Sequence, residues 1–504
     1  MSNPNPPAPV DRAPRWFVVL GLAALAAYAV FLAANGTTVA GGSDSSGYLN
    51  SARLFAEGQL QTELRVPAEF GAVAENDRVR FTPLGFFPHP NNPHLPPTYP
   101  PGLPLHFSAA SKVFGWAAGP WIVEIGAALA AVWLCYRVAR EFRLDWPLAA
   151  AGALSLAVSP VFLFASIQPL SDTLATAWCL AAVLAAMRAR QNSRWATAGG
   201  IAFAIAVLVR PTNVVLLPAL LVLIGFNWRR LVIFGLAGLP FAVWIAYYNH
   251  TLYGAAMKSG YGDWKLAFKI SYFLPTAAHF GRWLFLLLPG ALLIMAIATV
   301  ALRRVHSRGL LALALWFGAI TGVYACYEVS HEVWWCLRFI LPAMPALIIA
   351  GLLGIAALSE RWAGTRSRHV RLAMAAVLAA WAFAASWYWT AKFGVRLIKL
   401  YENVYAEAAL SSRAQVPPNA LVVGLYMSGA IYYYMDNPVL RWDQVQAPEF
   451  ARYASLARAA GRPVFALIFD AEEKPVLQER CPGEWTRIGG VRNIGLWRLA
   501  SAPP

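Results

Sequence analysis

Apolar runs of membrane-spanning length recur along almost the whole chain and constrain its fold more than any other feature. The first runs from Trp16 to Ala34. We expect an uncleaved transmembrane helix there, because about 19 residues exceed the apolar core of a cleavable signal peptide. With 59% hydrophobic and 13% charged residues, the sequence predicts a polytopic membrane protein. The ten further runs, which bring the expected total to about eleven helices, lie near 120–136, 147–165, 173–187, 195–209, 212–227, 231–248, 283–302, 309–327, 338–358 and 370–389.

Basic residues lie between the apolar runs in small clusters and predict the orientation of the chain. Arg12 and Arg15 place the N-terminus in the cytoplasm. The alternation of sides holds if residues 101–118 form an interfacial helix rather than a crossing. The net charge of +16 is therefore a topology signal, and no nucleic-acid partner is expected. Every second connection carries such a cluster, namely Arg137, Arg140 and Arg143; Arg188, Arg190 and Arg194; Arg229 and Arg230; Arg303, Arg304 and Arg308; and Arg361, Arg366, Arg368 and Arg371.

Composition divides the chain into three regions. Residues 1–15 are rich in Pro and Asn and are expected to form a disordered cytoplasmic tail. Residues 16–390 form the predicted all-α transmembrane domain, with a first outer loop over residues 35–119. Residues 391–504 have the composition of a small α/β domain, which an odd number of spans places outside the cytoplasmic membrane. Within it we expect strands over 420–425, 464–470 and 495–499 and a helix over 448–460.

The sequence lacks the spacing patterns of several common sites. Its five cysteines show no paired or metal-ligand spacing, which predicts neither a disulfide framework nor a zinc site. His89 and His94 are possible metal ligands in a loop rich in Pro and Asn. The sequence shows no obvious third ligand beside them, so we favour solvated loop histidines. No phosphate-binding glycine-rich loop occurs, so we do not expect a nucleotide-driven reaction. We expect no required cofactor. A divalent metal stays open as an alternative, but no set of ligands in the sequence supports one.

Two acidic residues follow apolar runs on the predicted outer side. Asp44 lies in Gly-Gly-Ser-Asp-Ser-Ser-Gly-Tyr, where it or Ser45 can cap a helix that extends to about Glu57. Asp44 can equally act as a general base on an acceptor hydroxyl. Asp172 stands at the start of the fourth run, where it or Ser171 can be an N-cap. An ionisable group at the membrane boundary is also a functional candidate, so both interpretations stay open for both residues.

Two arginines also lie on the predicted outer side, although the positive-inside rule places most basic residues on the cytoplasmic side. Arg210 lies in Arg-Pro-Thr-Asn, and Arg338 lies in Trp-Trp-Cys-Leu-Arg-Phe. Arg338 follows Glu328, His331 and Glu332, and an exposed ion pair with either glutamate would contribute little stability. Alternatively, the two arginines bind an anionic headgroup such as a lipid phosphate, which suits a bidentate guanidinium.

Further polar and aromatic residues lie in the predicted outer loops. The proline-rich run over residues 96–104, which contains Tyr99, forces an extended chain against the membrane. The loop from Asn249 to about Pro275 combines aromatic residues with glycines, which suits either an interfacial belt or a sugar-stacking surface. The residues that we expect to contribute to substrate binding are Tyr99, Lys258, Tyr261, His331 and Glu332.

Taken in order, these motifs resemble the GT-C class of membrane glycosyltransferases. The resemblance is to the protein O-mannosyltransferase and aminoarabinose-transferase superfamily, in its bacterial branch of lipopolysaccharide galacturonosyltransferases. It covers about residues 16–390. The matching elements are Gly-Ser-Asp-Ser-Ser-Gly-Tyr, Tyr-Pro-Pro-Gly-Leu-Pro, Ser171-Asp172, Arg210-Pro211-Thr212 and the run from Trp334 to Pro345.

The resemblance implies a GT-C-type fold and transfer of a sugar from a polyprenyl-phosphate donor. The acceptor would be a glycolipid, lipopolysaccharide, polysaccharide or protein at the outer face of the cytoplasmic membrane. By resemblance, Asp44 is the base of an inverting transfer and Asp172 helps to shape the acceptor site. Arg210 and Arg338 are candidates for contacts with the donor phosphate, whose lipid tail would reach in from the surrounding membrane lipids.

Two other function classes stay open. A lipid or glycolipid transporter is one, although we find no internal repeat and no ionisable residue deep within a predicted span, apart from Glu124 near the edge of the second. A noncatalytic envelope-assembly protein that presents the C-terminal domain is the other. An enzyme forms a covalent product, and neither alternative does.

Overall fold

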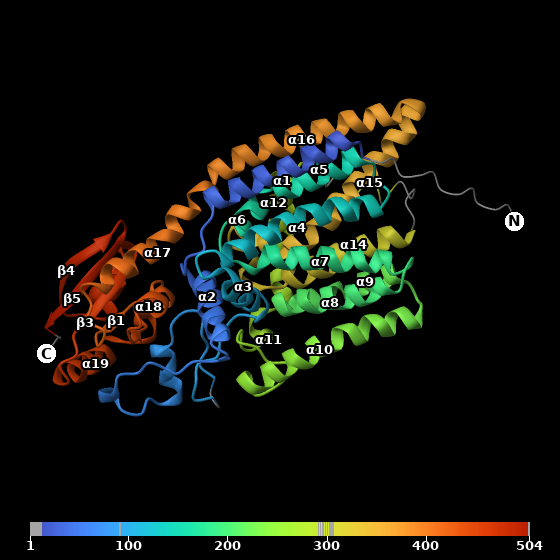
Figure 1. Ribbon diagram of the computed structural model, residues 1–504. Helices are drawn as coiled ribbons and strands as arrows, with labels where there is room; N and C mark the ends of the chain where they lie inside the picture. Colours follow the sequence, from blue (N-terminus) through green and yellow to red (C-terminus); the bar gives the residue numbers. More distant parts are fainter. Residues whose placement is uncertain are drawn as a thin grey trace.

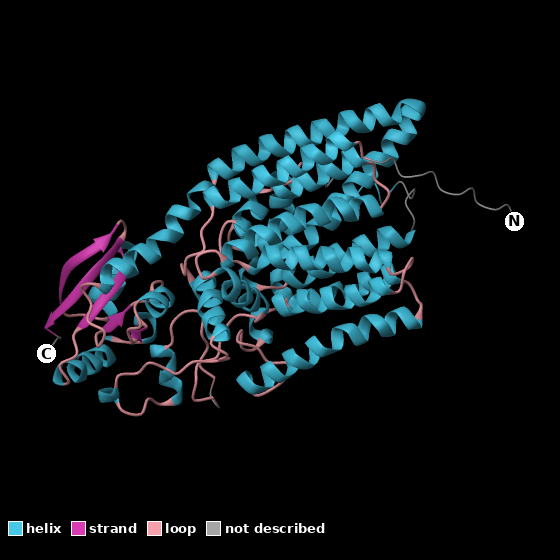
Figure 2. Ribbon diagram, viewed as in Figure 1, coloured by secondary structure: helices cyan, strands magenta, loops and turns pink. Residues whose placement is uncertain are grey.

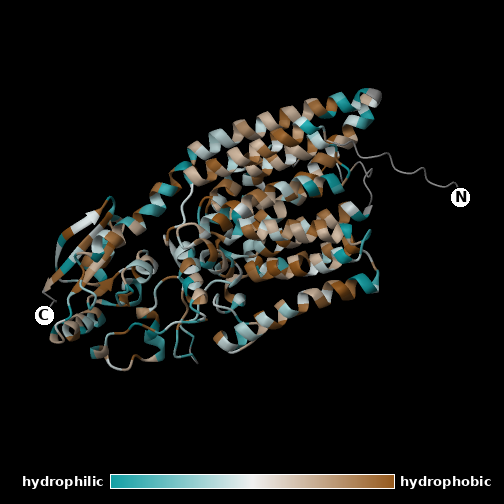
Figure 3. Cartoon of the chain, in the orientation of Figure 1, coloured by the Kyte–Doolittle hydropathy of each residue, from teal (hydrophilic) through white to brown (hydrophobic). Residues whose placement is uncertain are grey.

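The computed structural model describes residues 13–89, 92–290 and 307–501, together with residues 292, 294, 297, 299 and 301. Long helices form a bundle, and a small sheet with short helices lies beyond one end of it (Figures 1 and 2). Colouring by hydropathy shows apolar residues along the bundle and more polar ones in the sheet module and the connecting loops (Figure 3). The predicted tail falls largely outside the described residues.

Among the described residues, six helices are long and apolar enough to cross a membrane. A seventh span results if α5 (Trp146–Ala157) and α6 (Pro160–Ser166), which meet at a bend of 60°, count as one. The bend follows from Pro160, whose ring cannot continue the preceding helix. It leaves the Ala157 carbonyl to accept a hydrogen bond from the Tyr28 hydroxyl at 2.7 Å. The six are α1 (Arg15–Asn35), α4 (Gly119–Glu141), α10 (Trp228–Tyr253), α14 (Ser307–Ala325), α15 (Met344–Ala363) with the 3₁₀ turns before it (Trp334–Ala343), and α16 (Ser367–Lys392).

The other predicted spans coincide with shorter or less apolar helices. α12 (Phe273–Leu287) overlaps the start of the predicted run 283–302, part of which lies outside the described residues, as do Arg303 and Arg304. The structure therefore supports a helical bundle of several spans, of which six or seven meet the criteria of length and composition. The shorter helices are α7 (Ser171–Arg188), α8 (Arg194–Val209) and α9 (Leu217–Ile224), which follows 3₁₀ turns over Pro211–Leu216.

The first outer loop lies between the bundle and the sheet module. It contains α2 (Ser43–Ala56) and α3 (Gly102–Phe114), the second of which occupies the predicted interfacial segment. Gly85 has φ 96°, and a Cβ there would lie 2.4 Å from the Cα of Gly47. A Cβ on Gly47 would lie 2.4 Å from the Tyr99 ring and 2.9 Å from the Cα of Gly85. Two glycines thus let the proline-rich loop pack directly on α2.

The C-terminal module is a five-stranded sheet in the order β2-β1-β3-β5-β4. β1 pairs with β2 and β3 in parallel, and β5 pairs with β3 and β4 in antiparallel fashion. Helices α17 (Ile398–Arg413), α18 (Ser428–Tyr434) and α19 (Ala447–Ala459) pack around it, and α19 is the predicted helix. The strands are β1 (Leu421–Val423), β2 (Val439–Leu440), β3 (Val464–Phe469), β4 (Glu484–Val491) and β5 (Ile494–Ser501).

The three predicted strands are present, and two others were missed. β2 has two residues, too few for a periodic pattern, and β4 is an edge strand with mostly exposed residues and two glycines. The first outer loop also contributes to this module, because Phe81 packs in one core with Leu421, Phe450 and Tyr453. Sequence segments some 340 residues apart thus share a core, which joins the loop to the module.

Candidate active site

Four charged side chains from four separate elements meet at the end of the bundle next to α2. Nη2 of Arg338 donates to Oδ2 of Asp44 at 2.7 Å, and its Nη1 lies 3.5 Å from Oδ2 of Asp172. Nη1 of Arg210 donates to Oδ1 of Asp172. The residues come from the first turn of α2, the first turn of α7, the end of α8 and the 3₁₀ turns before α15. We call these four residues the charged network.

Burial makes this network energetically important. The side chain of Asp172 is 2% exposed, those of Arg338 and Arg210 are 11% and 13% exposed, and that of Asp44 is 30% exposed. Two carboxylates and two guanidinium groups leave the network with no net charge, which lowers the cost of placing it away from water. Asp172 lies between the two arginines and holds the network together, whereas Asp44 is its accessible end.

Asp44 remains ionised because of its cationic neighbours. Burial alone would raise the pKa of this carboxyl group, but the charge and hydrogen bond of Arg338 outweigh burial. A hydrogen bond from Tyr99 and the charge of Arg210 act in the same direction, and the resulting pKa lies below its usual range. Asp44 is therefore available as a proton acceptor at neutral pH.

Tyrosines surround the accessible end of the network. The hydroxyl groups of Tyr99 and Ser43 are 2.8 Å apart, and the Tyr48 hydroxyl donates to Oγ of Ser171 at 2.9 Å. The Tyr48 and Tyr99 ring centroids are 4.9 Å apart, and the Tyr261 ring stands edge-on to Tyr99 at 6.0 Å. Burial, reinforced by the charge of Asp44, raises the pKa of Tyr99. Tyr99 thus remains a neutral hydrogen-bond donor beside the carboxylate.

Aromatic rings fix the two guanidinium groups. Arg210 lies 5.4 Å from the Tyr324 ring centroid and 5.6 Å from that of Phe339. Arg338 lies 5.2 Å from Phe339 and 5.3 Å from Trp335. These distances fall within the range of cation–π attraction. Phe339 therefore lies beside both cations and separates them from the apolar interior.

A cavity of about 260 Å³ opens onto the charged network. Tyr261 is 55% exposed and lies at its mouth, which connects the network to the surface. Nε of Arg338 is buried and has no hydrogen-bond partner within the described part of the chain. We call this cavity the charged cavity; its lining is Asp44, Tyr48, Tyr99, Ser171, Asp172, Arg210, Tyr261, Tyr327, Val329, Glu332, Trp335, Cys336, Arg338 and Phe339.

The linker before α2 is held by the C-terminal module. The Gly42 N–H donates to Oε2 of Glu402 on α17 at 3.3 Å, and the Ala40 N–H donates to the Tyr434 hydroxyl at 3.0 Å. A Cβ on Gly41 would lie 1.9 Å from the same Glu402 oxygen, so no larger residue fits there without displacing Glu402. We call this arrangement the α17 clamp. It fixes the direction in which α2 leaves the bundle and thereby the position of Asp44.

Three interpretations based on local sequence are wrong. α2 is capped by Gly42, and neither Asp44 nor Ser45 makes a side-chain cap bond. α7 is capped by Leu170, again without a side-chain bond. Arg338 pairs with the two aspartates rather than with Glu328 or Glu332. In each case a partner distant in sequence replaces the expected neighbour, because helices from different parts of the chain converge here.

The predicted substrate-binding residues divide into two groups. Tyr99, Tyr261 and Glu332 line the charged cavity. Lys258 is exposed and His331 approaches Oγ1 of Thr276 on α12 at 3.4 Å, and neither lines the cavity. Four aromatic residues of the cavity were not predicted as site residues. Tyr48, Trp335 and Phe339 lie in the sequence motifs quoted above, and Tyr327 does not.

Comparisons with known proteins concern the fold and part of the sequence. Residues 99–249 match the family model described as dolichyl-phosphate-mannose-protein mannosyltransferase. A search of curated protein sequences finds no significant match. Among solved structures, ArnT from Cupriavidus metallidurans bound to undecaprenyl phosphate has a TM-score of 0.60 at 16% identity, over 98% of this chain and 100% of that chain.

Two other solved structures have the same fold. The Archaeoglobus fulgidus oligosaccharyltransferase in the apo form has a TM-score of 0.58 at 13% identity, over 91% of this chain and 70% of that chain. The arabinofuranosyltransferase AftD from Mycobacteria has a TM-score of 0.54 at 13% identity, over 98% of this chain and 40% of that chain. The predicted resemblance to the GT-C glycosyltransferases is confirmed at the level of the fold and of the family-model match over residues 99–249.

We expect Asp172→Ala to destabilise the folded protein by roughly 3–5 kcal/mol, because it leaves Arg210 buried without its counter-charge. Thermal unfolding of the purified protein measures the effect. Glu407→Ala, which breaks the half-exposed pair with Arg492 on the surface of the C-terminal module, is the matched control and should cost less than about 1 kcal/mol. Equal effects of the two substitutions would show that burial does not strengthen the Asp172 pairs.

Proposed function

We propose that this chain, which has the fold of the GT-C glycosyltransferases, transfers a sugar from a polyprenyl-phosphate donor to an acceptor. The transfer takes place at the end of the bundle where the charged cavity lies, which we call the site end. The observation that carries the proposal is one cavity that joins an ionised, accessible carboxylate to two buried guanidinium groups. The match to the mannosyltransferase model over residues 99–249 and the undecaprenyl phosphate bound by ArnT support it. The acceptor is a glycolipid, lipopolysaccharide, polysaccharide or protein.

The charged cavity suits an inverting transfer. The acceptor hydroxyl gives its proton to Asp44 while its oxygen forms a bond to the anomeric carbon of the sugar. The bond between that carbon and the phosphate oxygen breaks, and the polyprenyl phosphate leaves with the electron pair. Arg338 and Arg210 stabilise the negative charge that develops on the leaving phosphate. The donor carries its own leaving group, so the proposed reaction needs no nucleotide and no required cofactor.

The ion pair between Asp44 and Arg338 gives donor binding a role in activating the base. Without the donor, Arg338 holds the pKa of Asp44 low, and a carboxylate bound to a cation is a weak base. A donor phosphate in the charged cavity competes for the same guanidinium group, which lines that cavity. Binding of the phosphate therefore weakens the ion pair and makes Asp44 a stronger base. Asp172 keeps both arginines in place during the exchange.

The remaining residues of the cavity provide specificity in this proposal. Tyr99 and Tyr261 offer ring faces and edges for a sugar, and Glu332 offers an acceptor for sugar hydroxyl groups. Lys258 and His331 lie outside the lining, and we propose for them contacts with the parts of donor or acceptor that extend beyond the cavity. These roles follow from position and residue type.

We further propose eleven membrane spans in the cytoplasmic membrane, with the N-terminus inside and residues 391–504 outside. Helix direction supports this orientation. α7 has Asp172 in its first turn and ends at Arg188, about 25 Å away along the helix axis. There Arg188 pairs with Glu141 at the end of α4. The basic clusters thus gather at the end of the bundle opposite the charged cavity, which the positive-inside rule places in the cytoplasm.

Asp44→Asn keeps the shape of the side chain but cannot accept a proton. We expect transfer from a polyprenyl-phosphate sugar to fall by about 10²–10⁴-fold. Product formation is measured with purified protein and a panel of lipid-linked sugars, and thermal unfolding shows that the variant is folded. Glu407→Gln, on the surface of the C-terminal module, is the control and should retain activity. Wild-type rates in Asp44→Asn would remove Asp44 as the base, and lipid movement without covalent product would favour a transporter.

Arg338→Gln should shift the acidic limb of the pH profile of kcat/KM to higher pH. The limb reports the Asp44 carboxyl group in the free enzyme, and without Arg338 the effect of burial dominates and its pKa rises. On acidification, the variant therefore loses activity at a higher pH than the wild type does. Arg487→Gln, on the exposed face of β4, should leave the limb unchanged. An unchanged acidic limb in Arg338→Gln would show that Arg338 does not control the pKa of Asp44.

Cysteine labelling tests the orientation. In a Cys326→Ser background, whose other cysteines are buried, we expect Lys258→Cys to react with a membrane-impermeant thiol reagent in intact cells. Gln191→Cys, in the connection between α7 and α8, should react only after permeabilisation. The reverse pattern would invert the proposed topology.

A further inference from the structure

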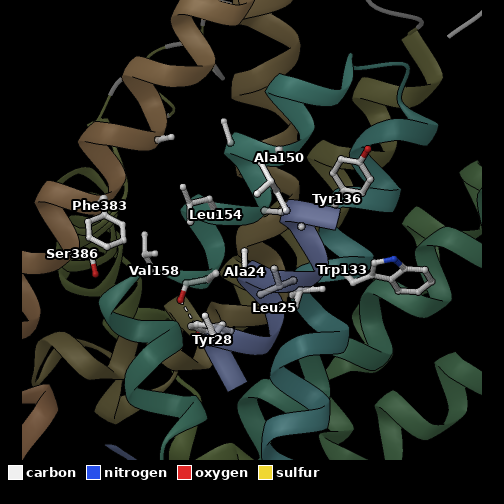
Figure 4. Close-up of a pocket in the computed structure, with 18 of the residues that line it drawn as sticks. Ala24, Leu25, Tyr28, Trp133, Tyr136, Ala150, Leu154, Val158, Phe383 and Ser386 are labelled. Carbon is white, nitrogen blue, oxygen red and sulfur yellow. Dashed lines mark hydrogen bonds between the residues drawn. The ribbon is translucent and has the colours of Figure 1, made fainter. Parts of the chain in front are cut away.

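A second, larger cavity opens on the side of the bundle, between α1 and α16. Its floor is formed by α4, α5 and α6, and its volume is about 1450 Å³. Figure 4 shows Leu25, Leu154, Val158 and Phe383 around it, from α1, α5 and α16 and from the bend between α5 and α6. We call it the lateral groove.

The lateral groove is distinct from the charged cavity. The two have no lining residue in common within the described part of the chain. One end of the groove lies beside the linker before α2, since Asn35 and Ile167 line the groove, and the Thr37 N–H donates to the Ile167 carbonyl at 2.8 Å. A ligand in the groove therefore lies beside the linker that leads to Asp44, without entering the charged cavity.

The dimensions of the groove match long hydrocarbon chains. Its lining on α1 runs from Phe17 to Asn35, a helical rise of about 27 Å, which is close to the thickness of a membrane core. Its volume exceeds the roughly 300–1,000 Å³ of common small-molecule sites. The lining between the two ends is almost wholly apolar. An occupant thus needs chains rather than a compact ring system.

Polar residues lie at the ends of the groove. At the site end these are Asn35, Ser386, Thr390 and Arg396. Arg396 is exposed, stacks on the Trp387 ring at 4.2 Å and forms no ion pair with the described carboxylates. At the opposite end, Arg137 stacks on the Trp133 ring at 5.2 Å, Arg140 donates to the Leu144 carbonyl at 3.0 Å, and Glu141 pairs with Arg188 at 2.6 Å. Both ends of the groove therefore present cations, and at the site end Arg396 is an exposed one.

We propose that the lateral groove binds an anionic two-chain phospholipid from the leaflet at the site end. Its phosphate lies against Arg396, with Asn35, Ser386 and Thr390 close to the glycerol region, and its acyl chains fill the apolar part between α1 and α16. The groove opens sideways to the membrane, so the lipid enters without crossing the charged cavity. This inference stands independently of the proposed transferase reaction, because it concerns a different cavity and a bound lipid that need not react.

Native mass spectrometry of the full-length, delipidated protein in detergent tests the proposal. The protein is titrated with dioleoylphosphatidylglycerol or with dioleoylphosphatidylcholine. We expect one molecule of the anionic lipid to bind more tightly than the zwitterionic one. Arg396→Ala should reduce that preference by about fivefold, which corresponds to roughly 1 kcal/mol for one cation near an anionic headgroup. Lys392→Ala, at the same end of α16 but outside the lining, should leave the preference unchanged.

A substitution that fills the groove provides an independent test. Ala376 on α16 is exposed and lines the groove, so Ala376→Trp should reduce binding of both lipids while the protein remains folded. Ala380→Trp adds the same side chain on the exposed part of α16 outside the lining and should bind lipid as the wild type does. Thermal unfolding of both variants separates loss of lipid from loss of fold.

Three results would overturn the proposal. The first is equal binding of the two lipids by the wild type, which would make the groove an ordinary lipid-exposed surface. The second is unchanged lipid binding in Ala376→Trp, which would place the lipid elsewhere. The third is a transmembrane peptide that copurifies with the wild type and is lost from Ala376→Trp, which would make the occupant a protein helix.

Discussion

The position of Asp172 between two arginines is the interaction on which the rest of the site depends. Its carboxylate is almost fully buried, and each of its oxygens faces a different guanidinium group. Arg210 ends α8 and Arg338 precedes α15, so one acidic residue at the start of α7 aligns three helices at the same depth. Buried opposite charges tolerate little displacement, because separation leaves each without water or partner. The aromatic rings beside the arginines restrict them further.

The network also explains how an accessible carboxylate can stand at an apolar boundary. Asp44 obtains its counter-charge from Arg338, which is already held by Asp172. An anionic ligand that takes up part of Arg338 changes the balance of the whole network rather than of one pair. Low net charge without a ligand and strong attraction for a phosphate thus result from the same four residues.

The sequence allowed much of this architecture to be predicted, for physical reasons that also set the limit. Hydrophobic runs of spanning length identify the bundle helices, and Asp44, Asp172, Arg210 and Arg338 are conspicuous because charge is rare at such positions. Their mutual pairing was not predictable, since Asp44 and Arg338 are 294 residues apart and glutamates stand closer to Arg338 in sequence. For the same reason local capping was expected at Asp44, where Glu402 of the distant α17 binds the Gly42 N–H instead. β4 escaped detection because an exposed edge strand lacks alternating burial.

The α17 clamp has a consequence for the order in which the protein becomes functional. Glu402 and Tyr434, which hold the linker of the residue that we assign as base, follow that residue by several hundred positions and are synthesised after it. Until α17 and α18 have emerged and docked, α2 has no fixed direction from the bundle. A nascent or truncated chain can therefore have every span inserted and still lack the geometry for chemistry. The geometry of the site therefore depends on the docking of α17 and α18 against the linker before α2.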